Sequence, residues 1–131
     1  MMLKILIADD SHLYVHLISG WLQDRGFEVV VASDAIQAFV MATQHRPEAV
    51  ILDISMPGGS GIDVLKKLKL STKTKHIPVL VVTGNAGNEM KSLVKRLGAA
   101  DLLEKPLDCA EFCTILSCLT VEAAPSPTAI T

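Results

Sequence analysis

Short apolar runs alternate with amphipathic segments along the whole chain. Five of these runs are rich in aliphatic residues and lack the polar alternation of a half-exposed strand, as expected of strands buried on both faces. They cover residues 3–8, 27–31, 49–52, 79–82 and 101–104. Each run is followed by a stretch whose apolar residues recur every three or four positions, which predicts one helix after each strand. Such strict alternation indicates a parallel sheet with helices on both faces.

The first predicted helix starts at Ser11 and is ended by Gly26. A serine at this position can cap the free backbone N–H groups of the first turn, and glycine is a common helix terminator. The stripe expected to face the core consists of Leu13, Leu17, Ile18, Trp21 and Leu22.

Capping patterns also mark the later helices. Ser60 followed by Asp63 resembles a capping box and predicts a third helix, whose lysines Lys66, Lys67 and Lys69 are expected to face solvent. The fourth helix is expected over residues 85–97, ending before a glycine.

Composition narrows the class of protein. The 131 residues are 50% hydrophobic and 20% charged, with a net charge of −2, which fits one domain with its own core. No excess of basic residues is available to bind nucleic acid or an anionic membrane in bulk. The longest apolar runs are far shorter than the roughly 20 residues of a membrane-spanning helix, and the N-terminal residues do not resemble a signal peptide.

Residues suited to phosphate chemistry follow four of the predicted strands. They are Asp9 and Asp10 after the first strand, Asp53 after the third, Thr83 after the fourth and Lys105 after the fifth. Because ligands bind beyond the carboxyl ends of the strands in an open α/β sheet, we expect these side chains to meet at one edge. Three clustered carboxylates require a cation, and their hard oxygens suit Mg²⁺. The added lysine and hydroxyl would hold a phosphoryl group.

A carboxylate is the expected acceptor of that group. The chain contains no G-x-x-x-x-G-K-[ST] loop for a nucleotide, and no Ser-His or Cys-His pair is suggested. An aspartate can form an acyl phosphate. Asp53 is the best candidate, because it is single, central and followed by a loop rich in glycine and proline.

Five blocks of sequence, taken in order, resemble the receiver domain of two-component response regulators. They are Asp9-Asp10, DISMPGGSG at 53–61, VVTG at 81–84, GAAD at 98–101 and Lys105-Pro106. Each block is weak evidence by itself, and Asp-Asp or Lys-Pro pairs often occur by chance, but together the blocks follow the family's order over residues 3 to about 119. The resemblance implies an α/β, flavodoxin-like, doubly wound five-stranded parallel sheet, in the order 2-1-3-4-5, with five helices.

The resemblance also implies a role for each matching residue. Asp53 would accept a phosphoryl group from a phosphohistidine on a sensor histidine kinase or phosphotransfer protein, with Mg²⁺ as cofactor. Asp10 would bind the metal directly and Asp9 mainly through a water molecule. Asp53 and the backbone carbonyl of Ser55 would complete the protein ligands. Lys105 would pair with Asp53 and then with a phosphoryl oxygen.

Two positions depart from the family pattern in the region that would act as the switch. In the family, the residue matching Thr83 would move toward the phosphoryl group and alter the face formed by the fourth helix, fifth strand and fifth helix. The resemblance also implies a cis peptide bond before Pro106. Leu102 stands where the family usually has a Tyr or Phe whose ring follows the threonine, and Gly84 stands where Ala is common. We therefore expect partners to sense the position of residues 84–97 instead.

These expectations describe a signalling domain rather than an enzyme, with self-phosphorylation and self-dephosphorylation as its only reactions. Residues 1–119 would form the receiver, and 120–131 a disordered tail or linker. The expected partners are a histidine kinase or phosphotransfer protein, a downstream output protein or domain, and a second copy in a homodimer. Neither direct nucleic-acid binding nor membrane insertion is expected, and the expected location is cytoplasmic.

Two other functions fit the pattern less well. Haloacid-dehalogenase-like phosphatases carry their nucleophile in a D-x-D pattern after the first strand, whereas the candidate here follows the third, and the chain has no room for their cap domain. A flavodoxin-like FMN-binding protein needs a loop rich in Ser and Thr after the first strand. Asp9 and Asp10 occupy that place and would repel the FMN phosphate.

Overall fold

Five strands alternate with five helices in the computed structural model, which describes residues 3–56, 61–84 and 86–123. The strands are β1 (Lys4–Ala8), β2 (Glu28–Ala32), β3 (Ala49–Asp53), β4 (Val79–Thr83) and β5 (Asp101–Glu104). The helices are α1 (His12–Asp24), α2 (Ala35–His45), α3 (Gly61–Leu70), α4 (Asn88–Arg96) and α5 (Cys109–Ala123). All strand pairs are parallel, in the order β2-β1-β3-β4-β5, so the predicted fold is confirmed.

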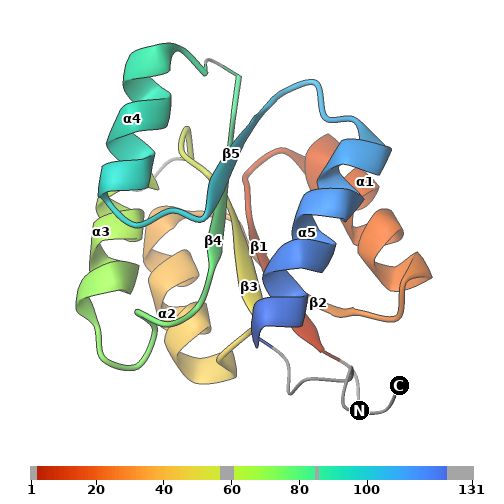
Figure 1. The fold of residues 1–131 in the computed structure, drawn as a ribbon. Coiled ribbons are helices and arrows are strands. Elements are labelled where there is room, and N and C mark those ends of the chain that lie inside the picture. The colour runs from red at the N-terminus through yellow and green to blue at the C-terminus, as the bar shows by residue number, and fades with distance from the viewer. Residues whose placement is uncertain (1–2, 57–60, 85, 124–131) are drawn as a thin grey trace.

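Helices cover both faces of the sheet, with α1 and α5 on one side and α2, α3 and α4 on the other (Figure 1). Successive residues of a strand point to opposite faces, so each strand supplies both cores. In β1, Ile5 and Ile7 pack in the core beneath α1 and α5, and Leu6 and Ala8 in the core beneath the other three helices. This is why the strands read as continuous apolar runs.

Helix α1 buries a narrower stripe than the sequence predicted. Ile18 and Leu22 are fully buried, whereas Leu13 is 65% and Leu17 38% exposed. Adjacent helical residues are about 100° apart. Leu17 precedes the buried Ile18 by one residue and Leu13 precedes it by five, so both leucines point away from the face that packs on the sheet. Trp21 packs beside the core stripe, with its ring centroid 5.6 Å from that of Phe112 on α5.

The fourth and fifth helices differ in length from the prediction. Helix α4 begins at Asn88, after Gly87 as its N-cap; the expected first residue, 85, lies outside the described residues. Glycine is unfavourable inside a helix, so Gly87 delays the start. Helix α5 continues to Ala123, beyond the expected boundary at residue 119, since no glycine or proline occurs before Pro125.

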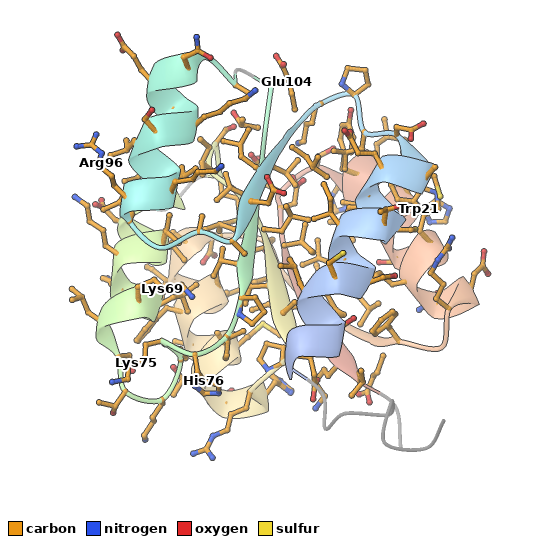
Figure 2. The ribbon with its side chains drawn as sticks, viewed as in Figure 1. Trp21, Lys69, Lys75, His76, Arg96 and Glu104 are labelled. Carbon is orange, nitrogen blue, oxygen red and sulfur yellow. The ribbon has the colours of Figure 1, made fainter. Side chains whose placement is uncertain are left out.

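Lys69 is part of the packing, which corrects its predicted exposure to solvent. Its Nζ donates to the carbonyl oxygens of Ile77, at 2.7 Å, and Lys75, at 3.2 Å, so the side chain closes the turn after α3. Burial lowers the pKa of this amine. In Figure 2, Lys75 and His76 lie toward the lower end of the molecule with Lys69 above them, and Glu104, at the carboxyl end of β5, lies at the top.

Gly61 starts α3 against the backbone of Ile54, where an added Cβ atom would collide. We expect Gly61→Ala to lower the free energy of unfolding by about 2 kcal/mol, as overpacking does in a core. Gly20 is the matched control, since nothing lies within 4 Å of its added Cβ and it is inside α1. Gly20→Ala should raise the free energy of unfolding by up to about 1 kcal/mol. Urea denaturation measures both, and equal shifts would contradict this account.

Candidate functional site

Three of the predicted acidic residues meet at the carboxyl edge of the sheet. Strands β1 and β3 are neighbours in its centre, so Asp9, just after β1, lies close to Asp53, the last residue of β3. Both are only 3% exposed, whereas Asp10 is exposed. One carboxylate oxygen from each residue lies within 4.8 Å of the other two. The sheet order thus brings together residues that are more than 40 positions apart in sequence.

Lys105 lies between the two buried carboxylates. Its Nζ is 3.3 Å from Oδ2 of Asp9 and 3.4 Å from Oδ2 of Asp53. The backbone N–H of Lys105 donates to the carbonyl oxygen of Thr83 at 2.8 Å, which fixes the start of this side chain beside β4. The peptide bond from Lys105 to Pro106 is cis.

The other oxygen of each buried carboxylate is held by the following loop. Oδ1 of Asp9 accepts the backbone N–H of Ser11 at 2.9 Å. Oδ1 of Asp53 accepts both the backbone N–H and the hydroxyl of Ser55, each at 3.0 Å. In both residues Oδ1 is therefore fixed by a serine, and Oδ2 faces the shared lysine.

Burial and charge move the pKa values of this cluster in different directions. Burial raises the pKa of Asp9, and the nearby Asp53 adds to the rise. Burial also acts to raise the pKa of Asp53, but the hydrogen bonds that Ser55 donates and the charge of Lys105 outweigh burial and lower the value. Burial opposes the charge of Lys105, yet the two carboxylates outweigh that effect and raise its pKa. One lysine cannot neutralise three carboxylates, so the cluster still favours a cation.

Tyr14 also belongs to the site, although the sequence pattern did not single it out. The Nζ of Lys105 lies 4.2 Å from the centroid of the Tyr14 ring. Ser11 caps α1 and accepts the backbone N–H of Tyr14 at 3.4 Å. The available signal was an aromatic residue in the first turn of the helix that follows the acidic pair.

Two of the predicted switch residues, Thr83 and Leu102, lie on β4 and β5, and Gly84 follows β4. Thr83 ends β4 and is 4% exposed, while Gly84 is exposed. Leu102 is 8% exposed and packs in the core beneath α2, α3 and α4. The expected glycine-rich loop at 57–59 and the capping residue Ser60 lie outside the described residues.

Comparison with known families decides the assignment. Residues 5–117 match the family described as the response regulator receiver domain. The chain belongs to this family. Protein PilH of Pseudomonas aeruginosa is 36% identical to this receiver over 107 residues, which are 82% of this chain and 88% of PilH. Response regulator PleD of Caulobacter vibrioides is 37% identical over 105 residues, but the receiver spans only 23% of its length.

Solved structures agree with the assignment. The chemotaxis protein CheY4 of Vibrio cholerae superposes with a TM-score of 0.85 at 31% identity, covering 91% of this chain and 99% of that one. The receiver domain of sensor histidine kinase PA1611 from Pseudomonas aeruginosa gives 0.84 at 25% identity, covering 92% and 98%, and holds a magnesium ion in its active-site cleft.

The predicted family and its general function are thereby confirmed: the chain is a phosphoacceptor signalling domain of two-component systems. Within the described residues, no helix is long and apolar enough to cross a membrane.

Proposed function

We propose that Asp53 of this receiver accepts the phosphoryl group, with Mg²⁺ held by Asp9, Asp10 and Asp53. The observation that carries the proposal is the convergence of three carboxylates and one lysine at the carboxyl edge of the sheet. Asp53 is the central member, because it ends β3, the middle strand of the sheet, and is flanked by Asp9 and Lys105.

The donor set fits Mg²⁺. The three side chains offer hard oxygens, the ligands that this ion prefers, and the cluster has more negative charge than Lys105 can balance. Asp10 is exposed and would bind directly, Asp9 mainly through a water molecule, and the backbone carbonyl of Ser55 would complete the protein ligands. The ion would supply positive charge to the oxygens of the transferring phosphoryl group.

The residues of the chain perform the rest of the transfer. A carboxylate oxygen of Asp53 forms a bond to phosphorus while the N–P bond of a phosphohistidine breaks, and the electron pair stays on the imidazole nitrogen. Lys105 then exchanges its contact with Asp53 for one with a phosphoryl oxygen. Thr83, at the end of the neighbouring strand, is the proposed hydroxyl partner that conveys the change to α4 and β5.

The proposed partners follow from this chemistry. The donor is a histidine kinase or a phosphotransfer protein, and the recipient of the signal is a separate output protein or an attached output domain. A cytoplasmic location, a homodimer and the role of Leu102 and Gly84 in switching remain predictions.

Incubation of the protein with Mg²⁺ and acetyl phosphate tests the proposal. We expect one phosphate per chain, bound as an acyl phosphate that hydroxylamine releases, and we expect EDTA to prevent its uptake. Intact-protein mass spectrometry measures both. Absence of the modification contradicts the proposal, and sustained turnover of a phosphomonoester would favour an enzyme instead.

A further inference from the structure

The ammonium group of Lys105 is enclosed on three sides. Its distances of 3.3 and 3.4 Å to Asp9 and Asp53 exceed the roughly 2.7–2.9 Å of tight charge-assisted hydrogen bonds. The third side is covered by the ring of Tyr14, whose centroid is 4.2 Å away. That lies well within the roughly 6 Å over which an aromatic face attracts a cation. The ring is therefore a substantial part of what holds Lys105 in place.

Tyr14 is itself held firmly. Its half-buried side chain packs against the core beneath α1 and α5, and its backbone N–H bonds to the capping hydroxyl of Ser11. The backbone N–H of Ser11 also fixes Asp9. The first turn of α1 thus positions one carboxylate of the site through Ser11 and its lysine through Tyr14.

We propose that Tyr14 is a positioning residue that keeps Lys105 at the pocket once a divalent cation binds the carboxylates, an inference that rests on the proposed function of this site. A divalent cation held by the carboxylate cluster would compete with Lys105 for the cluster's negative charge and would repel the ammonium group. The attraction of the Tyr14 ring does not depend on the carboxylates, so it persists. Lys105 then stays within reach of an incoming phosphoryl group.

Two variants separate a role of the ring from simple packing. Tyr14→Phe keeps the aromatic face and removes only the hydroxyl, whereas Tyr14→Leu keeps apolar bulk and removes the ring. If the ring positions Lys105, the leucine variant loses the attraction for the ammonium group and the phenylalanine variant retains it. Circular dichroism confirms that both variants are folded before they are compared.

The first measurement is made without metal. Urea unfolding in EDTA of the wild type, Tyr14→Leu, Lys105→Met and the double variant forms a double-mutant cycle. We expect the two positions to be coupled by a factor of about 2 to 30 in the unfolding equilibrium constant, the range of a cation–π contact. Additive effects would show that the ring and the ammonium do not interact and would overturn the inference.

The second measurement is the rate of phosphorylation by acetyl phosphate at saturating Mg²⁺. Tyr14→Leu should be slower than the wild type by about 2- to 30-fold, and Tyr14→Phe should be close to it. In the Lys105→Met background, Tyr14→Leu should have no further effect on the phosphorylation rate. Equal rates for wild type and Tyr14→Leu, or equal losses in both tyrosine variants, overturn the inference. If the wild type takes up no phosphate, the proposed function fails instead, and the cycle in EDTA decides the Tyr14 contact by itself.

Discussion

We expect the Asp53→Asn variant to take up no phosphate from acetyl phosphate and Mg²⁺, under conditions in which the wild type takes up one per chain. The amide lacks the charged oxygen that attacks phosphorus, so the acyl phosphate cannot form. Asparagine has nearly the same shape as aspartate, and its amide oxygen can still accept the bonds that Ser55 donates to Oδ1 of Asp53. The loss would therefore come from chemistry and not from a disrupted pocket.

Asp63→Asn is the matched control for this experiment. Asp63 is an exposed carboxylate in the first turn of α3, so the same exchange there removes one charge outside the cluster. It should leave phosphate uptake unchanged. Mass spectrometry of the intact protein and of its peptides measures both variants. Full uptake by Asp53→Asn would place the acceptor on another residue and contradict the assignment.

The second large effect is expected from Lys105→Ala, in EDTA at neutral pH. The variant leaves Asp9 and Asp53, each almost fully buried, without their shared cation. Removal of one partner from a fully buried ion pair costs about 3–5 kcal/mol. The side chain of Lys105 is 17% exposed, so solvent reduces that figure, and we expect a loss of about 2 kcal/mol in the free energy of unfolding. Lys73→Ala, at an exposed lysine, should change it little.

The loss in the free energy of unfolding of Lys105→Ala should depend on pH. The pKa of Lys105 is raised in the folded state, so its stabilising effect is present below the ordinary lysine value of about 10.4 and is lost as the pH rises through the folded value. The pKa of Asp53 is lowered, so its contribution is present above about 3.9 and is lost as the pH falls through the folded value. The difference between wild type and Lys105→Ala should be largest between about pH 5 and 10.

The ionisation of Asp9 affects the free energy of unfolding in the opposite direction to that of Asp53. The raised pKa of Asp9 means that ionisation of this residue costs stability as the pH rises above the ordinary aspartate value. Lys105→Ala increases that cost, so adding Asp9→Asn should restore part of the lost stability. Urea denaturation from pH 3 to pH 10 measures these effects. A difference between wild type and Lys105→Ala that stays constant over this range would contradict the ion-pair account.

The sheet and its functional edge were predictable because their signals are local. Apolar runs identify buried strands wherever both faces are covered, and residues that follow parallel strands must lie at one edge. Asp9, Asp53 and Lys105 are accordingly where the sequence placed them. The strand order itself came from the resemblance to a family, because apolar periodicity does not say which strands are neighbours.

Other features depend on how the elements pack. Leu13 and Leu17 fit an apolar helical stripe, but only the docking of α1 decides that Ile18 and Leu22 meet the sheet. Lys69 has the sequence context of a surface residue, yet it closes a turn because two carbonyl oxygens lie within its reach.

The sequence by itself determined the chemical groups of the site and the edge of the sheet where they meet. Only the tertiary structure decided what each group does there. Asp9 and Asp53 are the same residue type with similar burial, yet the pKa of one is raised and that of the other is lowered. Ser55 donates two hydrogen bonds to Asp53, whereas Asp9 receives one from Ser11 and is repelled by the charge of Asp53. Tyr14 likewise belongs to the site only because packing brings its ring 4.2 Å from the Nζ of Lys105. Hydrogen bonds and charge interactions depend steeply on distance, and distance is set by packing across the whole fold.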